Sequence, residues 1–281
     1  SVVERWVENP YWQYFCGFTH LQHEAPIDPS SMSRWRKRVG AERLEQLLQE
    51  TLDLAVREKH LAPSDLLQVT VDTTVQEKNI TYPTDSKLLH TAIRKLVEAA
   101  TERGVRLRQS YLRVGKRAAM MVGRYAHARQ FKRMRRELRR LRTWVGRLIR
   151  DVTRKVGTPD VELAEVLQRA ERIRRQQPQD SHKLYSWHEP EVQRISKGKA
   201  RQRYEFGQKV ALGTTNRSNW IVAARLMPHN PYDGHTLAAT LAAAESITGL
   251  AVTDAYVDKG YRGHGYQGAT RVHIAGGGIK S

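Results

Sequence analysis

Two aspartates lie in or next to predicted strands, where aspartate is disfavoured. Asp72 interrupts a segment, 65–74, in which apolar and polar residues alternate, and Asp258 directly follows the apolar segment 250–257. Carboxylates brought together from separate strand ends are ligands that Mg²⁺ prefers. Two such ions can hold the attacking and leaving oxygens of a phosphodiester displacement. The pair therefore suggests phosphodiester chemistry, with capped or surface aspartates as the alternative.

Two cations next to Asp258 could assist that chemistry. Lys259 and Arg262 lie in the glycine-containing turn that follows the strand. A cation beside a phosphodiester site would stabilise the charge that develops in the transition state. A simple salt bridge to Asp258 is the competing interpretation.

Several histidines offer weaker candidates. His229, Asp233 and His235 have a spacing that could suit a metal, but the segment beginning at Asp233 is more simply a turn that starts a helix. His182 and His188 flank aromatic residues near a predicted strand, where a loop or packed histidine is the ordinary role. We therefore expect no second metal site from these residues.

Positive charge is concentrated in one part of the 281-residue chain. The net charge is +19 and the pI about 10.3, while residues 94–155 hold 21 Lys and Arg against 4 Asp and Glu. Such a run is typical of a polyanion-binding protein, although many charge runs are only solvated helix faces. The single cysteine excludes a disulfide framework, and no apolar run is long enough to span a membrane.

A stripe of apolar residues, here called the helical seam, explains how that basic segment can fold. Apolar residues recur at steps of three and four from Phe131 to Val152, which predicts a helix with one packing stripe. Cations fill the positions between them, and we predict that these contact DNA: Arg133, Arg135, Arg136, Arg139, Arg140 and Arg142. The seam also makes self-association plausible, though packing within the helical block would satisfy it equally.

A second basic cluster follows the aromatic amino-terminal segment. Ser30 or Ser31 could cap a short helix that presents four cations to phosphate, as the second helix of a helix-turn-helix does. These cations are Arg34, Arg36, Lys37 and Arg38. A small helical cap with its own aromatic core is the alternative.

The remaining pattern predicts a mixed sheet with helices. Strands are expected in five segments, and helices over 86–177 and from about 233 to 246. The strand segments are 65–74, 204–212, 219–226, 250–257 and 271–275. The fold class is therefore α/β: residues 1–62 form a small helical domain, and residues 63–281 form a sheet domain interrupted at about 86–177 by a long basic helical insertion.

Longer motifs surround the two aspartates. The first runs from Val71 through Asp72 to Leu89, and the last is Tyr256-Val-Asp-Lys-Gly-Tyr-Arg-Gly263. Between them lie segments 183–191, Lys197-Gly-Lys199 with 204–207, and 230–236. Together these motifs resemble bacterial insertion-sequence transposases of the DDE type, over nearly the whole chain.

The resemblance implies an RNase H-like catalytic domain and a specific chemistry. Asp72 would be the first catalytic carboxylate and Asp258 the second, both holding Mg²⁺, with Mn²⁺ as a substitute. Water or a 3′-hydroxyl would then attack a phosphodiester at the element's ends. The implied partners are double-stranded DNA, both inverted-repeat ends and target, and further copies of the chain on that DNA. The implied location is the bacterial cytoplasm, in association with the nucleoid.

One departure from that family bears on activity. Its members carry a third carboxylate, a Glu on a helix after the last strand, whereas no Asp or Glu follows Asp258 here. We therefore expect a chain truncated at both ends, beginning inside a longer reading frame at Ser1, with severely impaired cleavage. The alternative is a non-catalytic transposase relic that still binds DNA. An RNA-binding protein is disfavoured because no base-stacking RNA module is evident.

Overall fold

The computed structural model describes residues 2–196 and 203–276, so the predicted motif Lys197-Gly-Lys199 lies outside the described residues. The chain forms two compact units. The first, here called the core unit, comprises residues 1–72, 212–225 and 233–281. The second, the helical unit, comprises residues 73–211 and 226–232.

The strands form a mixed sheet, as the sequence predicts. Its members in the described part of the chain are β1 (Gln68–Glu77), β2 (Gln193–Ser196), β3 (Tyr204–Thr215), β4 (Ile221–Leu226), β5 (Asp254–Val257) and β6 (Arg271–Ile274). Their order is β2-β3-β1-β5-β6, and β4 pairs with β3. β5 runs parallel to both β1 and β6, while β2 and β3 are antiparallel. The parallel trio carries the predicted aspartates.

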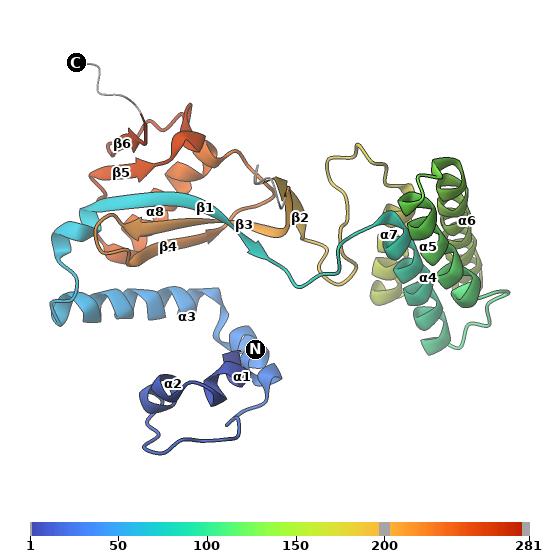
Figure 1. Cartoon of the computed structure of the whole chain (residues 1–281), viewed down its shortest axis with the longest axis horizontal. Helices are drawn as coiled ribbons and strands as arrows, with labels where there is room; N and C mark the ends of the chain where they lie inside the picture. The colour runs from blue at the N-terminus through green and yellow to red at the C-terminus, as the bar shows by residue number, and fades with distance from the viewer. Residues whose placement is uncertain (1, 197–202, 277–281) are drawn as a thin grey trace. The chain divides into compact units, whose positions relative to one another are not determined.

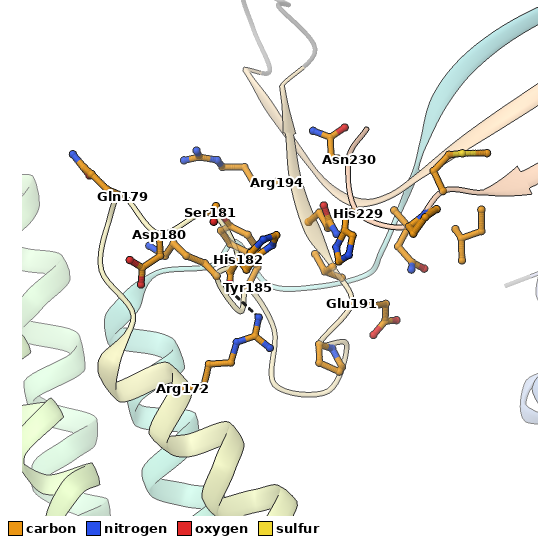
Figure 2. Close-up of a pocket in the computed structure, with 18 of the residues that line it drawn as sticks. Arg172, Gln179, Asp180, Ser181, His182, Tyr185, Glu191, Arg194, His229 and Asn230 are labelled. Atoms are coloured by element: carbon orange, nitrogen blue, oxygen red, sulfur yellow. Dashed lines mark hydrogen bonds between the residues drawn. The ribbon is translucent and has the colours of Figure 1, made fainter. Parts of the chain in front are cut away.

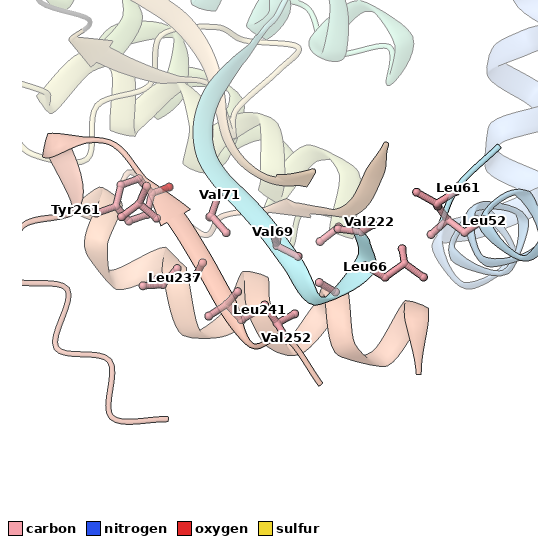
Figure 3. Close-up of a cluster of buried hydrophobic side chains, with 14 of the residues drawn as sticks. Leu52, Leu61, Leu66, Val69, Val71, Val222, Leu237, Leu241, Val252 and Tyr261 are labelled. Atoms are coloured by element: carbon pink, nitrogen blue, oxygen red, sulfur yellow. The ribbon is translucent and has the colours of Figure 1, made fainter. Parts of the chain in front are cut away.

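The core unit packs helices against apolar sheet residues. Its helices are α1 (Val2–Val7), α2 (Pro10–Phe15), α3 (Pro29–Arg57) and α8 (Leu237–Thr248), with short 3-10 helices at Pro63–Leu67, Asp233–Thr236 and Lys259–Tyr261. Val69 and Val71 of β1 are buried with Leu237 and Leu241 of α8, and Leu52 of α3 joins the same cluster (Figure 3). Alternating burial along β1 leaves the other sheet face to polar residues.

Helix α3 differs from the short helix predicted near residue 30. Asp28 is its cap, because its Oδ1 accepts a hydrogen bond from the Ser30 amide at 2.8 Å, so the assignment of the cap to Ser30 or Ser31 was wrong. Pro29 suits the first helical position because it lacks an amide hydrogen. The helix continues to Arg57 across a kink at Gly40, whose φ of 75° departs from helical geometry.

Four helices follow β1, in the segment 86–177 for which the sequence predicts helices. The helical unit contains α4 (Asp85–Glu102), α5 (Leu112–His127), α6 (Phe131–Val156) and α7 (Val161–Arg175), which lie side by side in Figure 1. Leu141 and Leu148 of α6 are buried among residues of the other three helices. The last helix begins at Val161 and not at Thr158-Pro159, because the side chain of Asp160 accepts from the Leu163 amide.

Several strand boundaries also differ from the predicted ones. β1 begins at Gln68, since Pro63–Leu67 form a 3-10 helix, and it continues to Glu77. β5 begins at Asp254, four residues later than predicted. Leu52 and Ala55 of α3 share a buried core with residues of β1 and α8.

Candidate phosphodiester site

The structure brings Asp72 and Asp258 together. β1 and β5 are adjacent parallel strands in which Val71 pairs with Val257, so the two aspartates are the next residues in register. Neighbouring strands lie about 4.8 Å apart, and paired residues of parallel strands project from the same face. The predicted pair therefore shares one face at the carboxyl end of β5.

A third aspartate lies beside this pair. The Asp258 side chain caps the turn that follows β5, accepting from the Gly260 amide at 2.9 Å. A Cβ atom placed on Gly260 would stand 3.0 Å from Oδ1 of Asp258 and 3.3 Å from Oδ2 of Asp233. A larger residue there would press against both carboxylates, which would have to move by a few tenths of an ångström. The sequence identified Asp233 as a turn residue but gave no signal that it approaches Asp258.

A buried tyrosine hydroxyl completes the cluster. Tyr261 is fully buried, and its hydroxyl oxygen makes no hydrogen bond among the described residues. Burial raises the pKa of this hydroxyl, and the charges of Asp233, Asp72 and Asp258 raise it further, while the Thr236 side chain acts in the opposite direction. The Tyr261 hydroxyl is therefore a neutral potential donor facing negative charge.

The donor set suits Mg²⁺ chemically but does not form a closed cage. Carboxylate oxygens are the hard ligands that Mg²⁺ takes, and water or substrate oxygens normally complete its coordination. Within residues 2–196 and 203–276, no three His, Cys, Asp or Glu side chains are grouped closely enough to hold a metal ion. The binding of Mg²⁺ by Asp72 and Asp258, which the resemblance implies, therefore stays a prediction. His229 and His235 likewise take part in no such group.

The two cations beside Asp258 occupy the turn predicted for them. Lys259 begins the 3-10 helix Lys259–Tyr261, and its Nζ lies 3.0 Å from the point where a Cβ on Gly276 would stand. In the described part of the chain, Lys259 makes no ion pair with Asp258, so the simple salt bridge is not formed by this residue. Arg262 ends the same turn.

A further carboxylate on β5 was missed by the sequence analysis. Asp254 is buried and lies close to two side chains of β6: Oδ1 is 2.8 Å from Nε2 of His273, and Oδ2 accepts from Arg271 at 3.0 Å. The hydrogen bond with His273, followed by those with Thr253 and Arg271, lowers the pKa of Asp254 to about 2. This group fixes β6 to β5 beside the site.

The amino-terminal cations lie on the surface of α3. Arg34, Arg36, Lys37 and Arg38 are all exposed. The Arg34 guanidinium donates to the hydroxyls of Ser30 and Ser31, and Arg36 donates to the Met32 carbonyl. Their contact with a phosphate backbone stays a prediction.

The predicted DNA-binding arginines of α6 have different surroundings. Arg133, Arg135, Arg136 and Arg139 are exposed. Arg140 is paired with Glu137 at 3.0 Å. Arg142 instead reaches Asp85 and the Gln176 carbonyl, both at 3.4 Å, and is only partly exposed. Its contacts lie within the bundle, so the structure gives Arg142 a bridging position between α6 and α4.

The helical unit also contains a cavity of about 950 Å³ (Figure 2). The rings of His182 and His229 lie 5.5 Å apart in it, and Arg172 donates to the His182 carbonyl at 2.7 Å. His229 has a φ of 61°, which is uncommon for a residue other than glycine. The sequence predicts a loop or packed histidine at His182. It gives no sign of the contact with His229, because the two residues are far apart along the chain.

Comparisons with known proteins give two similarities. Residues 1–38 match the family model described as "Transposase domain (DUF772)". The chain is also 57% identical over 131 residues to the "Uncharacterized protein ORF8 in nfe locus" of Rhizobium meliloti, a match that covers 47% of this chain and 63% of that relative. The chain thus spans less than two thirds of that relative's length. No solved structure matches it.

These findings support a relation to transposases. The matched residues 1–38 include α1, α2 and the start of α3 with its exposed cations.

None of the described helices combines the length and apolar composition that crossing a membrane requires.

Proposed function

We propose that the chain is part of an RNase H-like DDE transposase that cuts and joins DNA at the ends of a mobile element. The observation that carries this proposal is the register of the adjacent parallel strands β1 and β5, in which Val71 pairs with Val257, the residues directly before Asp72 and Asp258. The amino-terminal match to a transposase domain supports the same class. An α/β unit with a mixed sheet is compatible with an RNase H-like domain.

The residues of the core unit would have different roles in this reaction. Asp72 and Asp258 hold the cofactor, Mg²⁺ or Mn²⁺, and Asp233 adds negative charge beside Asp258. Bound Mg²⁺ would activate the attacking oxygen and stabilise the leaving one. The Tyr261 hydroxyl remains protonated because burial and three carboxylates raise its pKa, so it can donate a hydrogen bond but not accept a proton. Lys259 and Arg262 are placed to attract the phosphate of the substrate.

The basic surfaces would hold the DNA and bring copies of the chain together on it. Arg34, Arg36, Lys37 and Arg38 present charge on α3, and α6 presents a second set. Each phosphate that a cation neutralises releases counterions, so binding should weaken steeply as salt rises. Inverted-repeat ends and target DNA are the proposed partners, in the bacterial nucleoid.

A strand-transfer assay tests the catalytic part of the proposal. The longest reading frame that contains residues 1–281 is incubated with a labelled element end and Mg²⁺ or Mn²⁺. Asp72→Asn and Asp258→Asn should each reduce strand transfer at least 100-fold, because either change removes a charged ligand from the pair. DNA affinity, measured in EDTA, should change less than three-fold.

Asp53→Asn serves as the matched control because Asp53 is an exposed carboxylate on α3. It should leave strand transfer unchanged. Full activity in Asp72→Asn would contradict the proposal. Absence of strand transfer from every protein, with salt-dependent DNA binding retained, would support the non-catalytic relic instead.

A further inference from the structure

One face of α6 carries a stripe of arginines interrupted by one threonine. Side chains at steps of four and three share a helix face, and the stripe consists of Arg136, Arg139, Arg140, Thr143, Arg147, Arg150 and Arg154. The opposite face, with Leu141, Val145 and Leu148, is buried in the bundle. Packing therefore fixes which face of α6 carries the arginines.

Two hollows lie along this stripe. The first, about 460 Å³, is lined by Arg136, Arg139, Arg140, Thr143, Trp144 and Arg147. The second, about 770 Å³, includes Arg108, Tyr111, Arg147, Arg150 and Arg154 in its lining. Arg147 lines both hollows, so the two lie next to each other at this residue.

Much of this charge is not neutralised within the protein. Asp151 pairs with Arg154 and Lys155, and Glu137 pairs with Arg140. Considering residues 2–196 and 203–276, no carboxylate forms an ion pair with Arg136, Arg139 or Arg147. Like charges held close together repel each other, and a bound anion would relieve that repulsion.

An aromatic pair orients two of the guanidinium groups. Tyr111 and Trp144 are stacked, with ring centroids 5.6 Å apart. The guanidinium of Arg140 lies 5.1 Å from the Trp144 ring centroid, and Arg147 donates to the Tyr111 hydroxyl at 3.4 Å. These contacts hold the side chains without cancelling their charge, which reduces the entropy lost when a phosphate binds.

The length of the stripe identifies the kind of anion. From Arg136 to Arg154 the helix advances about 27 Å at about 1.5 Å per residue. Each strand of a nucleic-acid duplex places one phosphate about every 3.4 Å along its axis. A row of arginines over this distance matches a linear polyanion better than one small anion.

We propose that the Arg136–Arg154 face of α6 is a nucleic-acid backbone site, in which Arg136, Arg139 and Arg147 contact phosphates of duplex DNA. This inference rests on the proposed function, because DNA is taken as the polyanion. It narrows the sequence prediction to one face of α6, where Arg147 contacts Tyr111, and it leaves out Arg142, which is bound within the bundle. The face lies entirely within the helical unit.

The test compares two triple variants of equal charge in EDTA, where no cleavage occurs. Arg136→Gln/Arg139→Gln/Arg147→Gln removes three cations of the stripe. The control, Arg113→Gln/Arg117→Gln/Arg124→Gln, removes three exposed cations of α5 that line neither hollow. Affinity for a labelled duplex is measured by fluorescence anisotropy over a range of salt. Helical circular dichroism and the melting temperature verify that each variant is folded.

The stripe variant should bind the duplex at least ten-fold more weakly than the unmodified chain. Its plot of log affinity against log salt should also be shallower by about 2–3, because each phosphate contact contributes about 0.9 to the slope. The control should change affinity less than three-fold. Equal losses in both variants would overturn the inference in favour of net charge alone.

Two further arms separate the remaining explanations. Polyglutamate that displaces DNA at equal charge concentration would overturn a nucleic-acid site, since the face would then accept any polyanion. A stripe variant that binds like the unmodified chain, while strand transfer still depends on Asp72, would overturn this inference and leave the proposed function standing. An unmodified chain without affinity for DNA at any salt would contradict both.

Discussion

At the scale of single residues, Gly260 lies against two of the aspartates of the candidate site. Gly260 leaves space in which the carboxylates of Asp258 and Asp233 approach one point, and Asp258 bonds to the Gly260 amide. The Tyr261 hydroxyl lies near the same charges without a hydrogen bond of its own among the described residues. Such an unsatisfied buried group costs stability unless a ligand or ordered water contacts it, so the cluster has the features of a functional site.

Asp254 should make the folding stability of the protein decrease at low pH. Its pKa in the folded protein is about 2, below the ordinary value of 3.8, because of its hydrogen bonds with His273, Thr253 and Arg271. When the pKa of a carboxyl is lower in the folded protein than in the unfolded one, the carboxyl stabilises the fold fully at pH values above its unfolded-state pKa. This stabilisation is lost as the pH falls toward the folded-state pKa. Stability should therefore decline between about pH 4 and pH 2, and Asp254→Asn should remove this part of the decline.

Urea unfolding at several pH values measures the effect. Asp53→Asn, which alters an exposed carboxylate on α3, should leave the wild-type profile unchanged. An Asp254→Asn profile parallel to that of the wild type throughout this range would refute the assignment. Because Asp254 pairs with β6, the variant should also be less stable at neutral pH.

At the scale of elements, close packing between strands is set by a small residue in β3. A Cβ placed on Gly207 would stand 2.8 Å from the carbonyl carbon of Gln76, on the backbone of β1. Backbone cannot move aside as the end of a flexible side chain can, so the two strands could not keep their positions. The sequence shows this glycine within a predicted strand, but only the structure shows what approaches it.

Gly207→Ala should therefore destabilise the protein, by about 1–3 kcal/mol or more, through overpacking. Gly123→Ala is the matched control, because Gly123 lies within α5 with nothing within 4 Å of its added Cβ. That change should stabilise the helix by up to about 1 kcal/mol. Thermal unfolding of the two variants gives the comparison, and a Gly207→Ala protein as stable as the wild type would show that β1 and β3 are not this close.

At the scale of the whole molecule, the helical unit carries its own hydrophobic core. Ile93 of α4, Val122 of α5, Leu148 of α6 and Ile173 of α7 are buried in one cluster. Trp187, from the segment after α7, completes that cluster. Salt bridges from Arg103 to Asp160 and Glu162 join the end of α4 to the start of α7. A bundle closed in this way does not require the sheet to bury its apolar stripes.

A fragment of residues 84–192 should therefore fold alone. We expect a helical circular dichroism spectrum and a cooperative thermal transition. If the α6 face is the main DNA contact, the fragment should also bind duplex DNA with a similar dependence on salt. An unfolded fragment would show that the bundle depends on the rest of the chain. A folded fragment without DNA affinity would place the main DNA contact outside it.

The sequence by itself determined those features that depend on local pattern. Period-two alternation located β1 around Asp72, the steps of three and four located α6, and the charge count located the basic segment in the helical insertion. Helix and strand boundaries were less accurate, because Asp28 and Asp160 compete with nearby Ser, Thr and Pro as start signals. Local periodicity follows from backbone geometry, so it can be read without a partner.

Only the tertiary structure decided which distant residues meet. The register of β1 with β5 places Asp72 beside Asp258, and the turn at Gly260 brings Asp233 to them. Bundle packing directs Arg142 toward Asp85 while leaving Arg147 on the surface beside Tyr111. Cationic side chains look alike in a sequence, and their roles diverge only when packing determines which ones find a carboxylate and which remain for a phosphate.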